Sequence, residues 1–97
     1  MAISLVAKTK VVDPLETKVF RGNLGTYATG GVAIAPADVG LRVILAVIPM
    51  GGNDLTRRYA FDPVNSKIMS MVTSTGAETA NATDLSSINF DFVVIGY

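Results

Sequence analysis

The sequence predicts an all-β protein: an antiparallel β-sandwich with a jelly-roll-like arrangement, or a small β-barrel, of about seven short strands. Three observations predict this class. Val, Ile and Thr number 28 among 97 residues, and these side chains favour a pleated surface. Apolar and polar residues alternate with a period of two in several segments. Gly and Pro recur between those segments, as is typical of turns, and no long segment has helical periodicity.

Two strands are predicted near the N-terminus, at residues 3–12 and 15–21. In the first, Ser4, Val6, Lys8 and Lys10 share the face expected to point to solvent. The opposite face carries Ile3, Leu5, Ala7, Thr9 and Val11. The dipeptide Asp13-Pro14 is expected to end this strand, because Pro lacks an N–H and restricts the residue before it. In the second strand, Leu15, Thr17 and Val19 alternate with Glu16, Lys18 and Phe20.

The middle of the chain predicts three further strands, at residues 27–35, 41–48 and 55–61. Gly30-Gly31 indicates a bulge or a close backbone approach in the first of these. Residues 36–40 are expected to form a turn or short crossover. Residues 43–48 are apolar without alternation, which predicts a strand covered on both faces, followed by a flexible loop at 49–54. Arg57 and Arg58 are neighbours in a strand, so we expect them on opposite faces.

The last third predicts strands at residues 67–73 and 88–97. A hairpin turn is expected at 62–66, with Asn65 able to adopt a positive φ. Met69 and Met71 lie on the face opposite Ile68 and Ser70, and they form either an adaptable contact with a partner or a second core face. Residues 78–84 are expected to form a loop, and residues 84–87 one capped turn.

Composition bounds the class of protein. The 97 residues make one β domain, 1–97, in which residues 1–12 form an N-terminal strand or an arm used in assembly. Eight basic residues balance eight acidic ones, which excludes the basic surface that nucleic acid or an anionic membrane requires. Only 16% of residues are charged, against about a quarter in a typical domain. We therefore expect part of the outside to be covered by other protein.

Catalytic motifs are missing from the sequence. There is no His, Cys or Trp, which removes the commonest metal ligands and nucleophiles, so we expect no metal, no cofactor and no enzymatic activity. No Ser-x-x-Lys or Gly-x-Ser-x-Gly motif provides an activated hydroxyl. The glycine clusters lack the Lys of a phosphate-binding loop. The carboxylates, including Asp54, Asp62, Asp84 and Asp91, are interpreted as turn residues and residues of solvated strand faces.

A set of short segments is similar to a known family. The segments are Tyr-Ala-Thr-Gly-Gly-Val-Ala at 27–33, Asp-Pro-Val-Asn-Ser-Lys-Ile at 62–68, Thr-Gly-Ala-Glu at 75–78, Thr-Asp-Leu-Ser at 83–86 and Phe-Val-Val-Ile-Gly-Tyr at 92–97. In this order and spacing the chain resembles small structural proteins of tailed bacteriophages that decorate or cement the head shell. The resemblance spans residues 27–97. One departure is the closing Gly-Tyr, where the family pattern has Gly followed by a basic residue.

The resemblance implies a β-rich decoration protein without enzymatic activity. Such a protein would be a homodimer or homotrimer on the outer surface of the capsid in the virion, bound to the major capsid protein and assembled in the bacterial cytoplasm. Neither nucleic acid nor a membrane is an expected partner. The N-terminal strand and the loop at 49–55 are the expected contact elements. The candidate protein-contact residues are Val6, Phe20, Met50, Leu55, Arg57, Met69 and Met71.

Two other functions remain open from the sequence. A tail or neck subunit of a phage would also be β-rich and oligomeric. A small β-barrel that binds a sugar or an apolar ligand would show inward aromatic residues around a concave pocket, for which seven aromatic residues without Trp provide little support.

Overall fold

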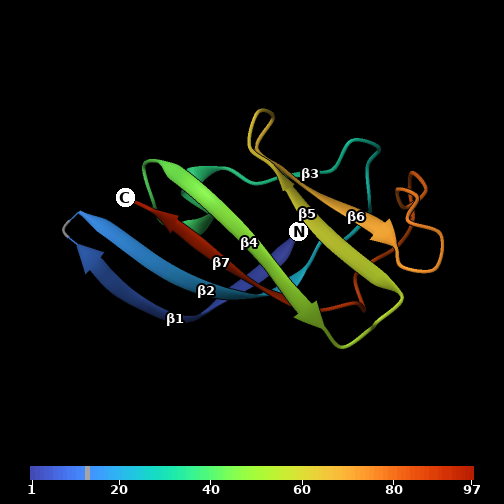
Figure 1. The fold of residues 1–97 in the computed structure, drawn as a ribbon, viewed down its shortest axis with the longest axis horizontal. Coiled ribbons are helices and arrows are strands. Elements are labelled where there is room, and N and C mark those ends of the chain that lie inside the picture. Colours follow the sequence, from blue (N-terminus) through green and yellow to red (C-terminus); the bar gives the residue numbers. More distant parts are fainter. Residues whose placement is uncertain (13) are drawn as a thin grey trace.

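Seven strands and one short 3₁₀ helix make up the fold in a computed structural model, which describes residues 1–12 and 14–97 (Figure 1). The elements are β1 (Ala2–Val12), β2 (Leu15–Asn23), β3 (Val32–Ala33), η1 (Pro36–Val39), β4 (Ile44–Gly52), β5 (Arg57–Asp62), β6 (Lys67–Val72) and β7 (Phe90–Gly96). None of the helices in the described ranges combines the length and apolarity needed to span a membrane.

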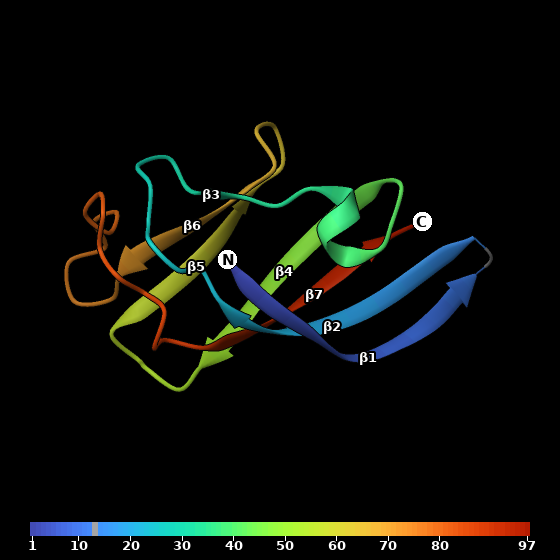
Figure 2. The same ribbon diagram turned by 180° about the vertical axis from the view of Figure 1, so that it is seen from behind.

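The strands form two antiparallel sheets, which confirms the predicted all-β class. One sheet has four strands in the order β1-β2-β7-β4, and the other has three in the order β3-β6-β5. The β1–β2 hairpin extends beyond the rest of the molecule, and η1 lies over the four-stranded sheet on the side of the core (Figures 1 and 2). The strand predicted at residues 88–97 is confirmed as β7, and it lies between β2 and β4 in the larger sheet.

The core lies between the two sheets and is rich in aromatic side chains. Phe90, Phe92 and Val94 alternate along β7 and are almost fully buried. The Phe90 ring stacks on Tyr59 of β5, with centroids 3.9 Å apart, and Phe92 stacks on Phe20 of β2 at 5.6 Å. These contacts join both sheets into one hydrophobic cluster.

A β-bulge changes the predicted faces of the N-terminal strand. The register shifts between Leu5, which pairs with Phe20, and Ala7, which pairs with Val19. Leu5 and Ala7 therefore lie on opposite faces, and the expectation that they share a face is wrong. Val6, the extra residue, lies within the bulge, and such a residue is left unpaired. The predicted orientation of Val11 and the predicted strand end at Asp13 lie outside the described residues.

The apolar segment predicted at residues 41–48 forms an edge strand rather than a central one. β4 begins at Ile44 and continues through Pro49 to Gly52, where the sequence predicts a loop. Pro is tolerated here because the missing N–H of an edge strand can face away from its neighbour. Leu45 and Ile48 are 53% and 51% exposed, so the expectation of a strand covered on both faces is wrong for the chain alone.

The segment at residues 27–35 is mostly a loop, and only Val32–Ala33 is a strand. Gly30 and Gly31 have φ values of 91° and 110°, which turn the chain away from an extended path. The turn after β5 forms as predicted, with Asp62 Oδ1 accepting hydrogen bonds from the N–H groups of Val64 and Asn65. The positive φ falls on Ser66 instead of Asn65.

Candidate protein-contact sites

The four-stranded sheet presents a continuous uncharged surface on the side away from the core. Residue pairs in register place Val19 beside Val93, Val93 beside Ile48, and Ile95 between Thr17 and Ala46. Ile48 is half-exposed and the others are partly exposed. We call this surface the outer face, and define it by Thr17, Val19, Ala46, Ile48, Val93 and Ile95.

The charged residues at one end of the outer face neutralise each other. Arg21 lies opposite Asp91 in the register, and its Nε and Nη2 donate to Oδ1 and Oδ2 at 2.8 and 3.1 Å. These bonds hold the pKa of Asp91 below its ordinary value and raise that of Arg21. Since both charges are paired, this end adds little net charge to the surface.

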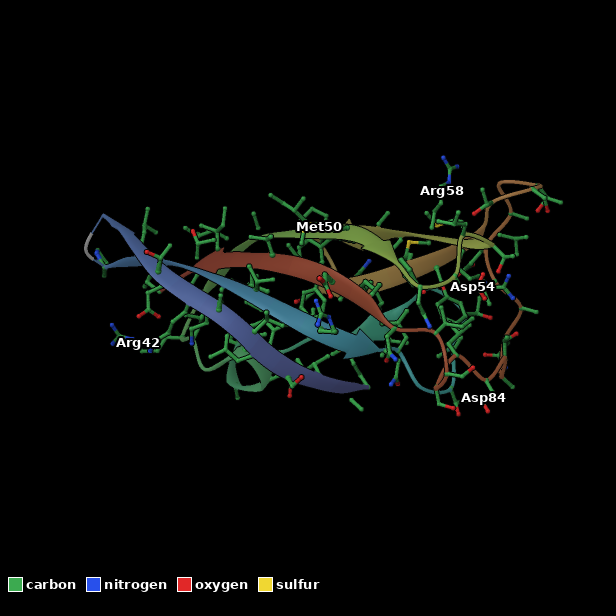
Figure 3. The ribbon with its side chains drawn as sticks, turned by 90° about the horizontal axis from the view of Figure 1, so that it is seen from below. Arg42, Met50, Asp54, Arg58 and Asp84 are labelled. Atoms are coloured by element: carbon green, nitrogen blue, oxygen red, sulfur yellow. The ribbon has the colours of Figure 1, made fainter. Side chains whose placement is uncertain are left out.

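A second exposed site lies at the corner where β4 turns into β5. It is a cavity of about 470 Å³, which we call the corner pocket. Its lining residues are Pro49, Met50, Gly51, Gly52, Asp54, Leu55, Arg57, Arg58, Tyr59 and Thr73. Figure 3 shows Asp54 and Arg58 toward one end of the molecule, Met50 nearer its middle and Arg42 toward the other end.

The corner pocket combines three of the predicted contact residues. Met50, Leu55 and Arg57 all line it, although they come from a strand end, a turn and the next strand. Leu55 is 83% exposed at the turn. The prediction that this stretch is accessible for contact therefore agrees with the structure. Whether a partner binds there stays a prediction.

The polar groups of the corner pocket are unevenly paired. The Asp54 carboxylate accepts hydrogen bonds from Thr56 Oγ1 and N at 2.6 and 2.8 Å, which lower its pKa. Arg57 Nε and Tyr59 Oη are buried, and among the described residues neither has a hydrogen-bond partner. Burial, followed by the charge of Asp54, raises the pKa of the Tyr59 hydroxyl. Unpaired buried donors are costly, so these two atoms require an explanation.

The two arginines share a site that strand alternation did not predict. Arg57 pairs with Val72 and Arg58 with Met71, so their side chains leave opposite faces of β5. Both nevertheless line the corner pocket, because the pocket lies at the free edge of β5. The two arginines, expected on opposite faces of the strand, therefore still contribute to one site.

Phe20 is not a contact residue, which corrects another prediction. It is 5% exposed and belongs to the core. A lysine such as Lys18, on the same face of β2 as Phe20, ordinarily points to solvent. Lys18 instead points inward, where its Nζ donates to the carbonyl oxygens of Val39 and Gly40 at 2.8 and 3.2 Å. These hydrogen bonds offset the cost of burying the ammonium group, so the face of β2 that carries Lys18 can point toward the core.

The remaining predicted contact residues lie on accessible surfaces. Val6 is 49% exposed, as predicted for the N-terminal strand. Met69 and Met71 lie on the side of β6 opposite the buried Ile68 and Ser70, and they are partly exposed. Whether a partner contacts these two methionines stays a prediction.

The other buried or partly buried polar groups have structural partners. Glu78 accepts a hydrogen bond from Tyr27 Oη at 2.6 Å and from the N–H of Gly30 at 2.7 Å. Burial, with this bond, raises the pKa of Tyr27 to about 12, and the same bond lowers that of Glu78. Ser70 Oγ and Thr79 Oγ1 are 2.8 Å apart. Within residues 1–12 and 14–97, no three acidic side chains gather as a metal site would require.

Comparison of the chain with protein-family models, with curated proteins and with solved structures finds no match.

Proposed function

We propose that this chain is a structural subunit that decorates the head shell of a tailed bacteriophage. It binds the outer surface of the major capsid protein shell and associates with copies of itself. The segment resemblance points to this role, and the observation that carries it is the outer face. A decoration protein needs rigid, uncharged contact area and no chemistry, and the outer face offers that area on a regular sheet.

The outer face suits association with protein because the free energy of association grows with the apolar area that is buried. Its residues come from three adjacent strands, β2, β7 and β4, so their relative positions are held by the sheet. Burying about 400 Å² of apolar surface contributes roughly 10 kcal/mol before the cost of association. Repetition on an icosahedral shell multiplies such contacts into avidity. The paired Arg21 and Asp91 leave no unpaired charge to desolvate at that end.

The test is the place and number of copies in virions. Purified virions should contain the chain on the head, in a fixed ratio to the major capsid protein. Heads that lack it should lose thermal or osmotic tolerance, and adding the purified chain should restore that tolerance. A copy number near that of the tail rings, with labelling on the tail, would assign the chain to the tail or neck. Absence from virions would contradict both assignments.

A further inference from the structure

β4 and β5 follow each other in the chain, yet they belong to different sheets. β4 is the last strand of the four-stranded sheet, where it pairs with β7, and β5 is the last strand of the three-stranded sheet, where it pairs with β6. In the described residues no ladder joins β4 to β5. The turn at residues 53–56 therefore connects two strand edges, and the corner pocket lies between them. Free strand edges carry the N–H and C=O groups that bind extended peptides.

Nothing in the fold requires a glycine at position 51. Its φ is not among the positive values of the chain, and a Cβ built on it meets no atom within 4 Å. Gly51 also lies in the register shift of β4 between Pro49, paired with Phe92, and Gly52, paired with Phe90. A side chain here would project into open space, and Gly51 lines both the corner pocket and a second hollow beside Arg21 and Asp91. A glycine at this position leaves room for another backbone to approach.

The charge of the corner pocket favours an acidic ligand. Arg57 and Arg58 oppose the single carboxylate of Asp54, which already accepts two hydrogen bonds from Thr56. Arg57 Nε and the hydroxyl of Tyr59 have no acceptor among the described residues. A carboxylate that enters the pocket would supply a counter-charge for the arginines, and it would reach the two buried donors only if their side chains moved toward it. The aliphatic wall of Pro49, Met50 and Leu55 would bind an apolar neighbour of that carboxylate.

We propose that the corner pocket binds an extended acidic segment of a partner protein, in which carboxylates alternate with aliphatic side chains. Alternation follows from the period of a strand, since one face of the segment would meet the arginines and the other the wall. A second copy of the chain fits poorly. Its β1, an edge strand, carries lysines and no acidic residue. The pocket would bind such a segment whatever assembly the outer face belongs to.

The test uses the full chain, labelled with ¹⁵N, and a synthetic probe of about seven residues that alternates valine with glutamate and has blocked ends. Titration followed by NMR should shift the amide signals of Met50, Gly51, Leu55 and Arg58 in a saturable way. The matched probe with glutamine in place of glutamate should bind at least about tenfold more weakly, because it lacks the charge-assisted bonds.

Variants of the chain separate pocket binding from folding. Gly51→Val should lower the affinity for the glutamate probe at least about tenfold with an unchanged midpoint of thermal unfolding, because its side chain meets no neighbour. Ala33→Val is the matched control, since it places the same valine side chain at an exposed strand position outside the pocket, and it should bind as the wild type does. Arg58→Gln should also weaken binding and provides a second readout if Gly51→Val does not fold.

Three results would overturn the proposal: no saturable shift at the corner pocket, equal affinity for the glutamine probe, or full affinity in Gly51→Val and Arg58→Gln. Shifts confined to the outer face would assign the probe to that surface and also contradict the proposal. None of these measurements involves virions, so their failure leaves the decoration role untouched.

Discussion

The outer face and the corner pocket are both exposed, but they differ in what a partner must provide. The outer face is uncharged, and its residues are held in register across three paired strands. The corner pocket lies between two strand edges and contains two arginines, one carboxylate and two buried donors that have no partner among residues 1–12 and 14–97. A partner of the first needs only complementary apolar area, whereas a partner of the second needs a carboxylate in a defined place.

This difference shows how one small fold can separate affinity from specificity. Apolar area contributes free energy without direction, so the outer face suits contacts that repeat many times in an assembly. Charge-assisted hydrogen bonds depend on distance and angle, so the corner pocket suits recognition of one chemical group. The two sites also use opposite features of a sheet, the centre in one case and the edges in the other.

The largest expected effect comes from a charge placed on the outer face. Ile48→Asp puts a carboxylate on a half-exposed position next to Val93. If the outer face is buried in the assembly, this charge is desolvated without a partner, and association should weaken more than about a hundredfold. Sedimentation with purified heads measures binding to the shell, and analytical ultracentrifugation of the free chain measures association between its copies.

Leu55→Asp is the control for that variant, because Leu55 is more exposed but lies at the corner pocket. It should leave association through the outer face unchanged. Both variants should retain the wild-type free energy of unfolding to within about 1 kcal/mol, as is usual for exposed positions. Equal loss of association in the two variants would contradict the assignment of contacts to the outer face.

The next largest effect is on the free energy of unfolding, and it distinguishes Gly52, which the fold requires, from its neighbour Gly51, which it does not. A Cβ on Gly52 would lie 2.1 Å from the Asn89 carbonyl oxygen and 2.9 Å from Phe90 Cβ, so Gly52→Ala must displace backbone. We expect it to lower the free energy of unfolding by about 2 kcal/mol or more. Gly51→Ala should change it by less than about 0.5 kcal/mol. Urea unfolding of both variants measures the difference.

The sequence predicts the strands better than it predicts their faces. Alternation and turn residues are local signals, and they predict seven strands. The part of the chain that the structure describes also contains seven. The bulge at Val6 and the inward turn of Lys18 are not local. The first depends on the pairing of β1 with β2, and the second on carbonyl groups that a distant segment, Val39-Gly40, brings within hydrogen-bond distance. These two features account for the errors at Leu5, Ala7 and Phe20.

The corner pocket was also predictable only in part, because some of its residues come together through contacts between distant parts of the chain. Met50, Leu55 and Arg57 were identified as contact residues because they are near an apparent loop, and the structure places all three in the pocket. Arg58 and Tyr59 were not, because alternation assigns the two arginines to opposite faces. Only the position of β5 at the edge of its sheet brings both arginines to one cavity. Sheet order depends on contacts between distant parts of the chain, and no local pattern of residues reports it.

Salt should weaken binding at the corner pocket but not association through the outer face. Raising NaCl from about 0.1 M to about 1 M shortens the Debye length from roughly 10 to 3 Å. Binding of the glutamate probe at the corner pocket should weaken about tenfold, because it depends on Arg57 and Arg58. Association through the outer face should be unchanged or slightly stronger, because its residues are uncharged. Equal salt dependence at both sites, measured by isothermal titration and ultracentrifugation, would contradict the contrast.

The smallest expected effects come from acid, and they distinguish the carboxylates beside the two sites. The pKa of Asp91 is lowered by its hydrogen bond to Arg21, and that of Asp54 by its hydrogen bonds to Thr56, each from an ordinary value of 3.8. Since each folded pKa lies below the unfolded one, each group stabilises the fold above about pH 4, and this stabilisation is lost as pH falls through the folded pKa. Asp91→Asn and Asp54→Asn should each flatten the decline of unfolding free energy between about pH 5 and pH 2. The decline should persist in part, because Asp62, Glu78 and Asp84 also have lowered pKa values.

High salt should reduce the contribution of Asp91, whose partner is charged, more than that of Asp54, whose principal partner is neutral. Urea unfolding across this pH range at low and high salt measures both contributions, and a contribution of Asp54 that falls with salt as steeply as that of Asp91 would show that Arg57, rather than Thr56, holds the carboxylate in the corner pocket.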